Sequence, residues 1–284
     1  MLYISFMYFR ILKKIGFVLL VIFALIGAGF TGMYFAVKWG WTNTRGGIDK
    51  QRESFLNNTQ TANVIGSQQQ KYWQTTEEWN ILKTALIKDK AVLYRAASAS
   101  GVSPRLIASQ LIVEQLRMFN SDRESYKKFF APLKILGSQT QFSWGVMGIK
   151  RETAIIIEKN LKDTSSPYYL GQQYEHLLDF HTTDIENERF IKMTDQHDHY
   201  GSYLYAGLYL RQFMQQWKSA GFDISKQVDI LATLYNIGFS GSKPHADPKA
   251  GGAMITIGER TYSFGSLAQE FYDSNELLDE FPRE

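Results

Sequence analysis

The stretch from Ile15 to Val37 carries no charged side chain, and it restricts what this chain can become more than any other feature. As an α-helix it would be about 34 Å long, enough to cross about 30 Å of hydrocarbon. Basic residues precede it at 10, 13 and 14 with no acidic residue among them, which favours a cytoplasmic N-terminus. Basic residues at 38, 45, 50 and 52 reduce this asymmetry. We expect one transmembrane helix at 15–37 behind a short cytoplasmic segment at 1–14.

A cleaved signal peptide is the alternative for this stretch. The apolar run is long and no A-x-A cleavage site follows it, so we expect an uncleaved signal anchor. Residues 38–70 are polar, contain two adjacent glycines and end in three glutamines, which is typical of a tether. A globular domain is then expected at 71–284, on the outer side of the membrane.

The composition excludes several classes of function. The chain has no cysteine, which excludes disulfides, thiolate zinc sites and a cysteine nucleophile. A net charge of +3 is too small to indicate a nucleic-acid partner. Asp195, His197, Asp198 and His199 could suggest a metal, but their spacing matches no zinc pattern. We expect no metal, no cofactor and no nucleic-acid partner.

The spacing of apolar residues predicts a mainly α-helical domain without strong strands. Ser103 and Pro104 are favourable residues for a helix start, and Gly238 is favourable just after a helix end. Helices are predicted at about 79–99, 103–119, 152–161, 200–217, 227–236 and 262–277.

Within the predicted helix 103–119, one carboxylate lies in an apolar stripe. Ile107, Leu111, Glu114 and Met118 fall on one helical face. Burying a charged carboxylate is costly, so such a group is usually paired or kept protonated. A protonated carboxylic acid is what a glycosidase needs to protonate a leaving-group oxygen. The alternative is that Glu114 lies at the core edge and reaches a buried arginine or solvent.

Three short segments resemble, in the same order, motifs of the lysozyme-like lytic transglycosylases. VEQ at 113–115 resembles the segment around their catalytic glutamate, and GVMG at 145–148 resembles their Gly-x-Met-Gln turn. LYNIG at 234–238 resembles their Ala-Tyr-Asn-x-Gly motif, and the segment around Gly207 resembles a helix that precedes it. The resemblance covers about residues 98–240.

This resemblance implies an α-helical lysozyme-like fold and cleavage of the β-1,4 bond between N-acetylmuramic acid (MurNAc) and N-acetylglucosamine (GlcNAc) in peptidoglycan. Glu114 would protonate the bridging oxygen and then act as base on the C6 hydroxyl, which closes a 1,6-anhydro ring. Peptidoglycan glycan strands would be the partner, reached from a bacterial cytoplasmic membrane. Partner proteins of the cell envelope stay unknown.

The resemblance also implies roles for neighbouring residues. Tyr235 would hydrogen-bond near Glu114, and Asn236 would hold the late helix end or contact the sugar. Met147 would line the cleft, and Gly145 would permit a turn that a Cβ hinders. Independently, Trp144 beside this turn is the aromatic residue expected to line the cleft.

Two residues depart from the family pattern. Gln115 replaces a serine that contacts substrate, and Gly148 replaces a glutamine that supports the site. These departures leave two alternatives. The first is a muramidase related to goose-type lysozymes, with Asp122 or Glu124 activating water. The second is a non-catalytic envelope scaffold or glycan-binding domain.

Three basic residues are further candidates for substrate contact. Arg105, Arg117 and Lys150 are candidate contacts for the acidic stem peptide of peptidoglycan.

Overall fold

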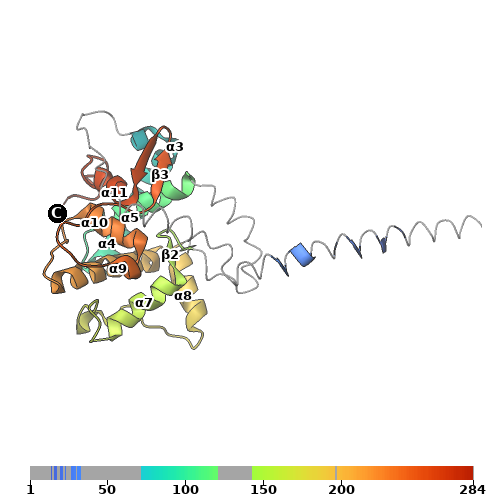
Figure 1. Ribbon diagram of the computed structural model, residues 1–284, viewed down its shortest axis with the longest axis horizontal. Helices are drawn as coiled ribbons and strands as arrows, with labels where there is room; N and C mark the ends of the chain where they lie inside the picture. The colour runs from blue at the N-terminus through green and yellow to red at the C-terminus, as the bar shows by residue number, and fades with distance from the viewer. Residues whose placement is uncertain are drawn as a thin grey trace, which may run out of the picture.

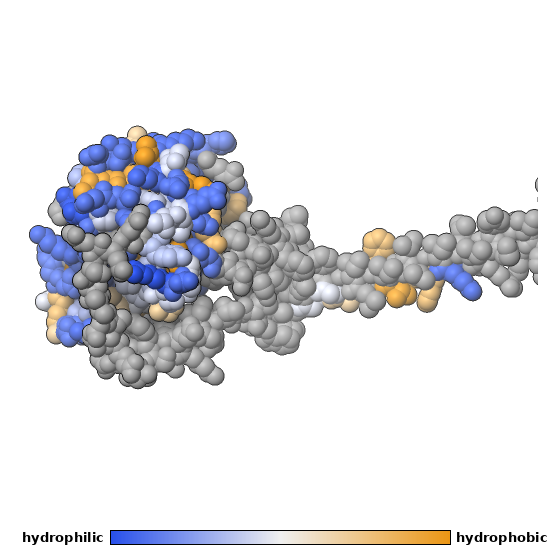
Figure 2. Space-filling view, turned by 90° about the horizontal axis from the view of Figure 1, so that it is seen from above, coloured by the Kyte–Doolittle hydropathy of each residue, from blue (hydrophilic) through white to orange (hydrophobic). Residues whose placement is uncertain are grey.

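The computed structural model describes residues 72–120, 143–195 and 197–283, together with scattered positions between 14 and 32. These scattered positions are helical, and the apolar side chains among them are exposed. Figure 2 shows orange, hydrophobic patches on this segment beside near-white and blue ones, whereas the face of the domain in this view is largely blue. Among the described residues, no helix is long and apolar enough to cross a membrane. The expected tether at 38–70 and the candidates Asp122 and Glu124 lie outside the described residues.

The described part is mainly helical, as predicted. Its α-helices are α3 (Glu77–Lys88), α4 (Lys90–Ser100), α5 (Pro104–Phe119), α7 (Arg151–Lys162), α8 (Ile185–Thr194), α9 (Tyr200–Ser219), α10 (Val228–Ile237) and α11 (Phe264–Tyr272). Short 3-10 helices occur at η1 (Tyr72–Thr75), η4 (Gln172–Tyr174) and η5 (Phe239–Gly241). Two antiparallel hairpins pair β1 (Ser143–Trp144) with β2 (Ile149–Lys150) and β3 (Met254–Ile257) with β4 (Arg260–Ser263).

Helix α5 is surrounded by other elements on most of its circumference. It contacts α3, α4, α9, α10, α11 and β3. Figure 1 shows α7 and α8 on one side of the domain and α3, β3 and α11 on the other, with α4, α5, α9 and α10 between. Every residue of α5 from Pro104 to Glu114 is buried. A polar side chain in this buried stretch is therefore costly unless it has a partner inside the protein.

A glycine lets α9 approach α4 and α5 closely. A Cβ at Gly207 would lie 2.3 Å from Ser100 Oγ and 3.2 Å from Ile107 Cδ1. Because no side chain separates the helices, α5 is held directly against α9. This close approach explains why the segment around Gly207 carries a glycine in the middle of a helix, where glycine is otherwise unfavourable.

The predicted helix at 79–99 is two helices, which corrects the sequence expectation. Asp89 separates α3 from α4. Its carboxylate accepts a hydrogen bond from the Tyr203 hydroxyl at 2.7 Å and pairs with His199. Both partners lie more than a hundred residues away, His199 just before α9 and Tyr203 within it, so a local interpretation of 79–99 could not detect the break.

The last predicted helix is also corrected, because α11 is shorter than 262–277. Tyr262 belongs to β4, and the helix begins after Ser263, which forms a capping box with Ser266. The helix ends at Tyr272. Beyond it, the chain continues without regular helix and wraps around Arg105.

A buried ion pair joins α7, α8 and α9. Arg189 donates to both carboxylate oxygens of Glu158, at 2.6 and 2.8 Å, and the Tyr205 hydroxyl donates to the same carboxylate at 2.6 Å. Pairing satisfies charges that would otherwise be costly in the core. The pair fixes α8, whose last turn forms one wall of the site described next.

Candidate active site

Glu114 lies on α5 and is nearly fully buried, with 3% of its surface exposed. The helix begins where the sequence predicts, because the Ser103 hydroxyl accepts from the Leu106 backbone N–H at 3.2 Å and Pro104 is the first helical residue. Glu114 therefore stands near the third turn of a rigid, buried helix. Its carboxylate is positioned by α5 itself rather than by a loop.

The turn at 145–148 reaches this carboxylate through a glycine. Gly148 has φ +64°, and a Cβ placed there would lie 2.8 Å from Glu114 Oε2. Gly145 has φ +61°, and its Cβ would lie 1.9 Å from the Met193 carbonyl oxygen at the end of α8. Both positions thus require glycine for conformation and for space. In this chain, Gly148 admits the carboxylate where the family pattern places a glutamine.

Two side chains hold the same turn from two different helices. Gln115 on α5 donates from Nε2 to the Val146 carbonyl oxygen at 2.6 Å. Tyr235 on α10 donates from its hydroxyl to the Met147 carbonyl oxygen at 2.7 Å. The segments 113–115, 145–148 and 234–238 therefore meet at one place, although they are distant in sequence.

Tyr235 is a buried, protonated donor. Burial, followed by the negative charge of Glu114, raises the pKa of Tyr235 well above its usual value. Its ring lies between Tyr209, at 5.2 Å between centroids, and Phe264, at 6.4 Å. The phenol therefore stays protonated near neutral pH and donates to the turn, and its ring is fixed by aromatic neighbours.

Glu114 is paired with an arginine from its own helix. Arg117 donates from Nε to Glu114 Oε2 at 3.1 Å, and its Nη2 donates to the same oxygen. The exposed fraction of the side chain is 16% for Arg117 and 4% for Glu114. Glu114 thus has an arginine partner, as the alternative expectation proposed, although Glu114 is buried rather than at the core edge and Arg117 is only half-buried.

A second polar residue of α5 lies on the same face. Gln110, Glu114 and Arg117 follow the spacing i, i+4 and i+7. Gln110 is fully buried, and neither atom of its amide has a partner within the described part of the chain. The apolar stripe predicted for α5 is thus interrupted by a polar one. In the sequence, the i, i+4, i+7 spacing of these three residues indicates that they share one helical face.

The remaining sequence candidates lie in varied settings. The Met147 side chain is fully buried in the core beneath the turn. Asn236 accepts from the Ala253 backbone N–H at 2.8 Å and so ties α10 to the segment just before β3; its two expected roles stay predictions. Trp144 belongs to β1 and pairs with Ile149; the prediction about its ring lies outside the described side chains.

Arg105 corrects a sequence expectation, because it cannot contact a stem peptide. It is fully buried and donates to the carbonyl oxygens of Phe271, Tyr272, Ser274, Glu276 and Phe281. Burial lowers the pKa of Arg105. Arg105 therefore fixes the C-terminal segment, and of the three basic candidates Arg117 is the one next to Glu114.

The His-rich segment has structural roles. The Asp195 carboxylate accepts from the backbone N–H groups of His197 and Asp198, and His199 pairs with Asp89. Among the residues that the structure describes, no three His, Asp or Glu side chains gather in a way that would hold a metal ion.

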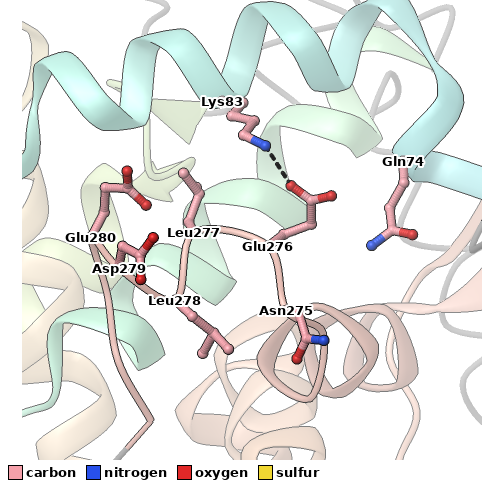
Figure 3. Close-up of a pocket in the computed structure, with 8 residues that line it drawn as sticks. All are labelled: Gln74, Lys83, Asn275, Glu276, Leu277, Leu278, Asp279 and Glu280. Atoms are coloured by element: carbon pink, nitrogen blue, oxygen red, sulfur yellow. Dashed lines mark hydrogen bonds and ion pairs between the residues drawn. The ribbon is translucent and has the colours of Figure 1, made fainter.

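An open cavity of about 500 Å³ lies between α3 and the C-terminal segment. Figure 3 shows Lys83 pointing across it to Glu276, with the two charged groups 2.8 Å apart. Arg105, at the first turn of α5, binds the backbone of this same segment. Glu114 is nine residues further along α5, about 13 Å at 1.5 Å per residue. The cavity contains none of the predicted site residues.

Comparisons of the chain with models of protein families, with curated proteins and with solved structures gave no match. The mainly helical fold is observed, and the lysozyme-like family stays a prediction from the three motifs.

Proposed function

We propose that this protein is a membrane-anchored lytic transglycosylase that cleaves the MurNAc–GlcNAc bond of peptidoglycan, with Glu114 as acid and base. One observation carries the proposal. The three segments that resemble family motifs converge on the Glu114 carboxylate: Gln115 and Tyr235 bind the turn, and Gly148 brings its backbone against the carboxylate. Three unrelated core segments have no reason to show both this order in sequence and this meeting in space.

The reaction requires one carboxylic acid acting twice. Protonated Glu114 gives its proton to the bridging oxygen as the bond from that oxygen to C1 of MurNAc breaks. The C6 hydroxyl oxygen then bonds to C1 and its proton passes to the Glu114 carboxylate. The products are a free GlcNAc hydroxyl and a 1,6-anhydro-MurNAc end, and no water is consumed. The acid is thereby regenerated for the next cycle.

The membrane anchor is part of the proposal. The described positions between 14 and 32 are helical, with Phe17, Leu20, Val21 and Phe23 exposed. Exposed large apolar side chains at successive helical positions are typical of a segment in contact with lipid. A single anchor at 15–37 would hold the domain on the outer face of a bacterial cytoplasmic membrane, where peptidoglycan lies.

A non-catalytic glycan-binding domain is the second candidate, and the Arg117–Glu114 ion pair favours it. An ionised carboxylate held by an arginine has no proton to donate. Such a pair also has an ordinary structural role, because it satisfies a charge inside the core. The two candidates predict different products from the same substrate.

The test is digestion of purified peptidoglycan with the full-length protein in detergent, followed by mass spectrometry. We expect anhydro-muropeptides from the wild type, and a loss of roughly 10²–10⁴-fold in their release for Glu114→Gln. Glu152→Gln, on the exposed first turn of α7, is the matched control and keeps its activity. Circular dichroism shows whether each variant is folded.

Two other results would replace the proposal. Reducing-end muropeptides would identify a muramidase. Co-sedimentation of the wild type with peptidoglycan, without release of any fragment, would identify a binding domain.

A further inference from the structure

The Arg117–Glu114 ion pair is local and readily opened. Both residues belong to α5 at i and i+3, and both donated hydrogen bonds go to one oxygen, Oε2. Within the described residues, Arg117 has no hydrogen bond or ion pair to any other group. Rotation of the Arg117 side chain alone would separate the two groups, so no helix needs to move.

Arg117 is the more accessible member of the pair. Its side chain is four times as exposed as that of Glu114, at 16% against 4%. It also lies in the last turn of α5, three residues beyond the buried carboxylate. Of the two charged groups, the guanidinium is therefore the one more accessible to a ligand.

Separating the pair would change the protonation of Glu114. A buried carboxylate without a countercharge favours its protonated form, because burial penalises the charge. Gly148 lies against the carboxylate and has no side chain to supply a cation, and the nearby Tyr235 phenol stays neutral. The protein would therefore take up a proton at the moment when Arg117 leaves.

We propose that Arg117 restrains Glu114 at rest and releases it when a carboxylate of the glycan's peptide binds the guanidinium. This inference rests on the proposed function and names the feature of the substrate that the site reads. Carboxylates are matched to the planar guanidinium, which binds them through two parallel hydrogen bonds. Peptidoglycan carries such carboxylates on the peptide attached to MurNAc, the sugar on which the acid acts.

The exchange balances in charge and protons. Arg117 keeps its positive charge and passes from one carboxylate to another. Glu114 changes from ionised to protonated by taking one proton from solvent, and the peptide carboxylate stays ionised. Arg117 is thus a positioning residue that controls whether Glu114 is protonated, and it takes no part in making or breaking bonds.

The first test measures binding without cleavage. The ligand is a GlcNAc–MurNAc disaccharide with its peptide, which contains no MurNAc–GlcNAc bond to cut. Calorimetry of the full-length protein in buffers of different ionisation enthalpy measures the protons taken up on binding. We expect an uptake of about one proton near neutral pH, and none with Glu114→Gln. The same disaccharide with amidated peptide carboxylates is the matched ligand, and we expect it to bind more weakly without uptake.

The second test uses cleavage and Arg117→Gln. The wild type should cleave strands with free peptide carboxylates about tenfold faster, as kcat/KM, than amidated strands. Arg117→Gln should lose this preference, and the alkaline limb of its pH–activity profile should move to higher pH. Arg117→Lys, which keeps the charge without the planar fork, should restore part of the preference.

The outcomes separate the two proposals. Absence of binding, binding without proton uptake, or an unchanged preference in Arg117→Gln would overturn the role of Arg117, even if cleavage occurs. Proton uptake that depends on both Glu114 and Arg117 would support it, even if no bond is cut and the transglycosylase proposal fails. The calorimetric test uses the wild-type protein, so it stands if Arg117→Gln does not fold.

Discussion

Gly148 determines how closely the backbone approaches the Glu114 carboxylate. Its φ of +64° and the 2.8 Å between its ideal Cβ and Glu114 Oε2 leave no room for a side chain. The family pattern places glutamine here, so the change to glycine looks unfavourable in sequence. In this chain the glycine is required, because the Glu114 carboxylate occupies the space where a side chain at 148 would begin.

We therefore expect Gly148→Ala to impair both folding and activity. The left-handed conformation costs alanine about 1–2 kcal/mol, and displacement of the acid lowers cleavage about a hundredfold. Denaturant unfolding and muropeptide release measure the two effects. Gly221→Ala is the control, because Gly221 has φ +90° with no atom within 4 Å of an added Cβ. Equal activity of the two variants would contradict the role assigned to Gly148.

Gln110 offers a second test that concerns a single side chain. Its amide is fully buried, and the part of the chain that the structure describes offers it no partner. Gln110→Met keeps the shape and removes the polar atoms, so we expect an increase of about 1–3 kcal/mol in the free energy of unfolding.

Gln212→Met is the matched variant. Gln212 is equally buried but donates to the Ile157 carbonyl oxygen at 3.0 Å and accepts from Asn160. We expect this change to lower the free energy of unfolding, because it leaves those partners unsatisfied. Destabilisation of similar size by both variants would mean that the Gln110 amide is hydrogen-bonded in solution.

At the scale of elements, Arg105 joins the start of α5 to everything that follows α11. Five carbonyl oxygens accept hydrogen bonds from its guanidinium. The guanidinium carbon also lies 4.7 Å from the centroid of the Phe271 ring. No acidic side chain is among these hydrogen-bond acceptors. The C-terminal segment thus keeps its irregular path because its backbone carbonyl groups bind a buried guanidinium.

Arg105→Lys should therefore loosen this segment. Lysine has at most three donors for five carbonyl groups, and we expect a loss of about 2–5 kcal/mol in the free energy of unfolding. Hydrogen exchange should rise across residues 271–281. Arg283→Lys is the control, because Arg283 binds the Tyr272 carbonyl from the exposed side at 3.0 Å. A change below about 0.5 kcal/mol in both variants would mean that Arg105 is not the fixing residue.

Helix ends with local causes were predictable, and those with distant causes were not. Ser103 starts α5 and Gly238 ends α10 as expected, because caps act within one turn. Asp89, which separates the two helices found in the first predicted one, has its side-chain partners at the start of α9 and just before it. The β3–β4 hairpin was missed although Ile255 and Ile257 are buried between exposed residues. This alternation spans only four residues and gives a weak signal.

The candidate site was also predictable only in part. The three motifs identified its residues, but that these residues lie together is visible only in the fold. The pairing of Glu114 with Arg117 needs no fold at all, since residues three apart on a helix are neighbours. The role of Arg105 could not be predicted, because its partners are backbone atoms without a sequence signature.

In the proposed topology, one membrane helix anchors a domain that lies in the periplasm or outside the cell. The direction of that helix decides whether the domain meets its substrate. We expect protease added to spheroplasts to digest the domain and to leave an N-terminal tag protected. A cytoplasmic marker protein controls for lysis. Protection of the domain, with digestion of the tag, would place the protein on the wrong side for cutting peptidoglycan.

The turn at 145–148 has a consequence for how this sequence can diverge. Gln115 and Tyr235 bind it through the carbonyl oxygens of Val146 and Met147, which every residue possesses. Side-chain identity at 146, half-buried at the turn, is thus less restricted than that of the two flanking glycines. A library of variants across this turn would tolerate apolar diversity at 146 and reject side chains at 145 and 148, while Met147 would have to stay apolar because its side chain is fully buried. Distant relatives would then share the glycine spacing more visibly than the residue at 146.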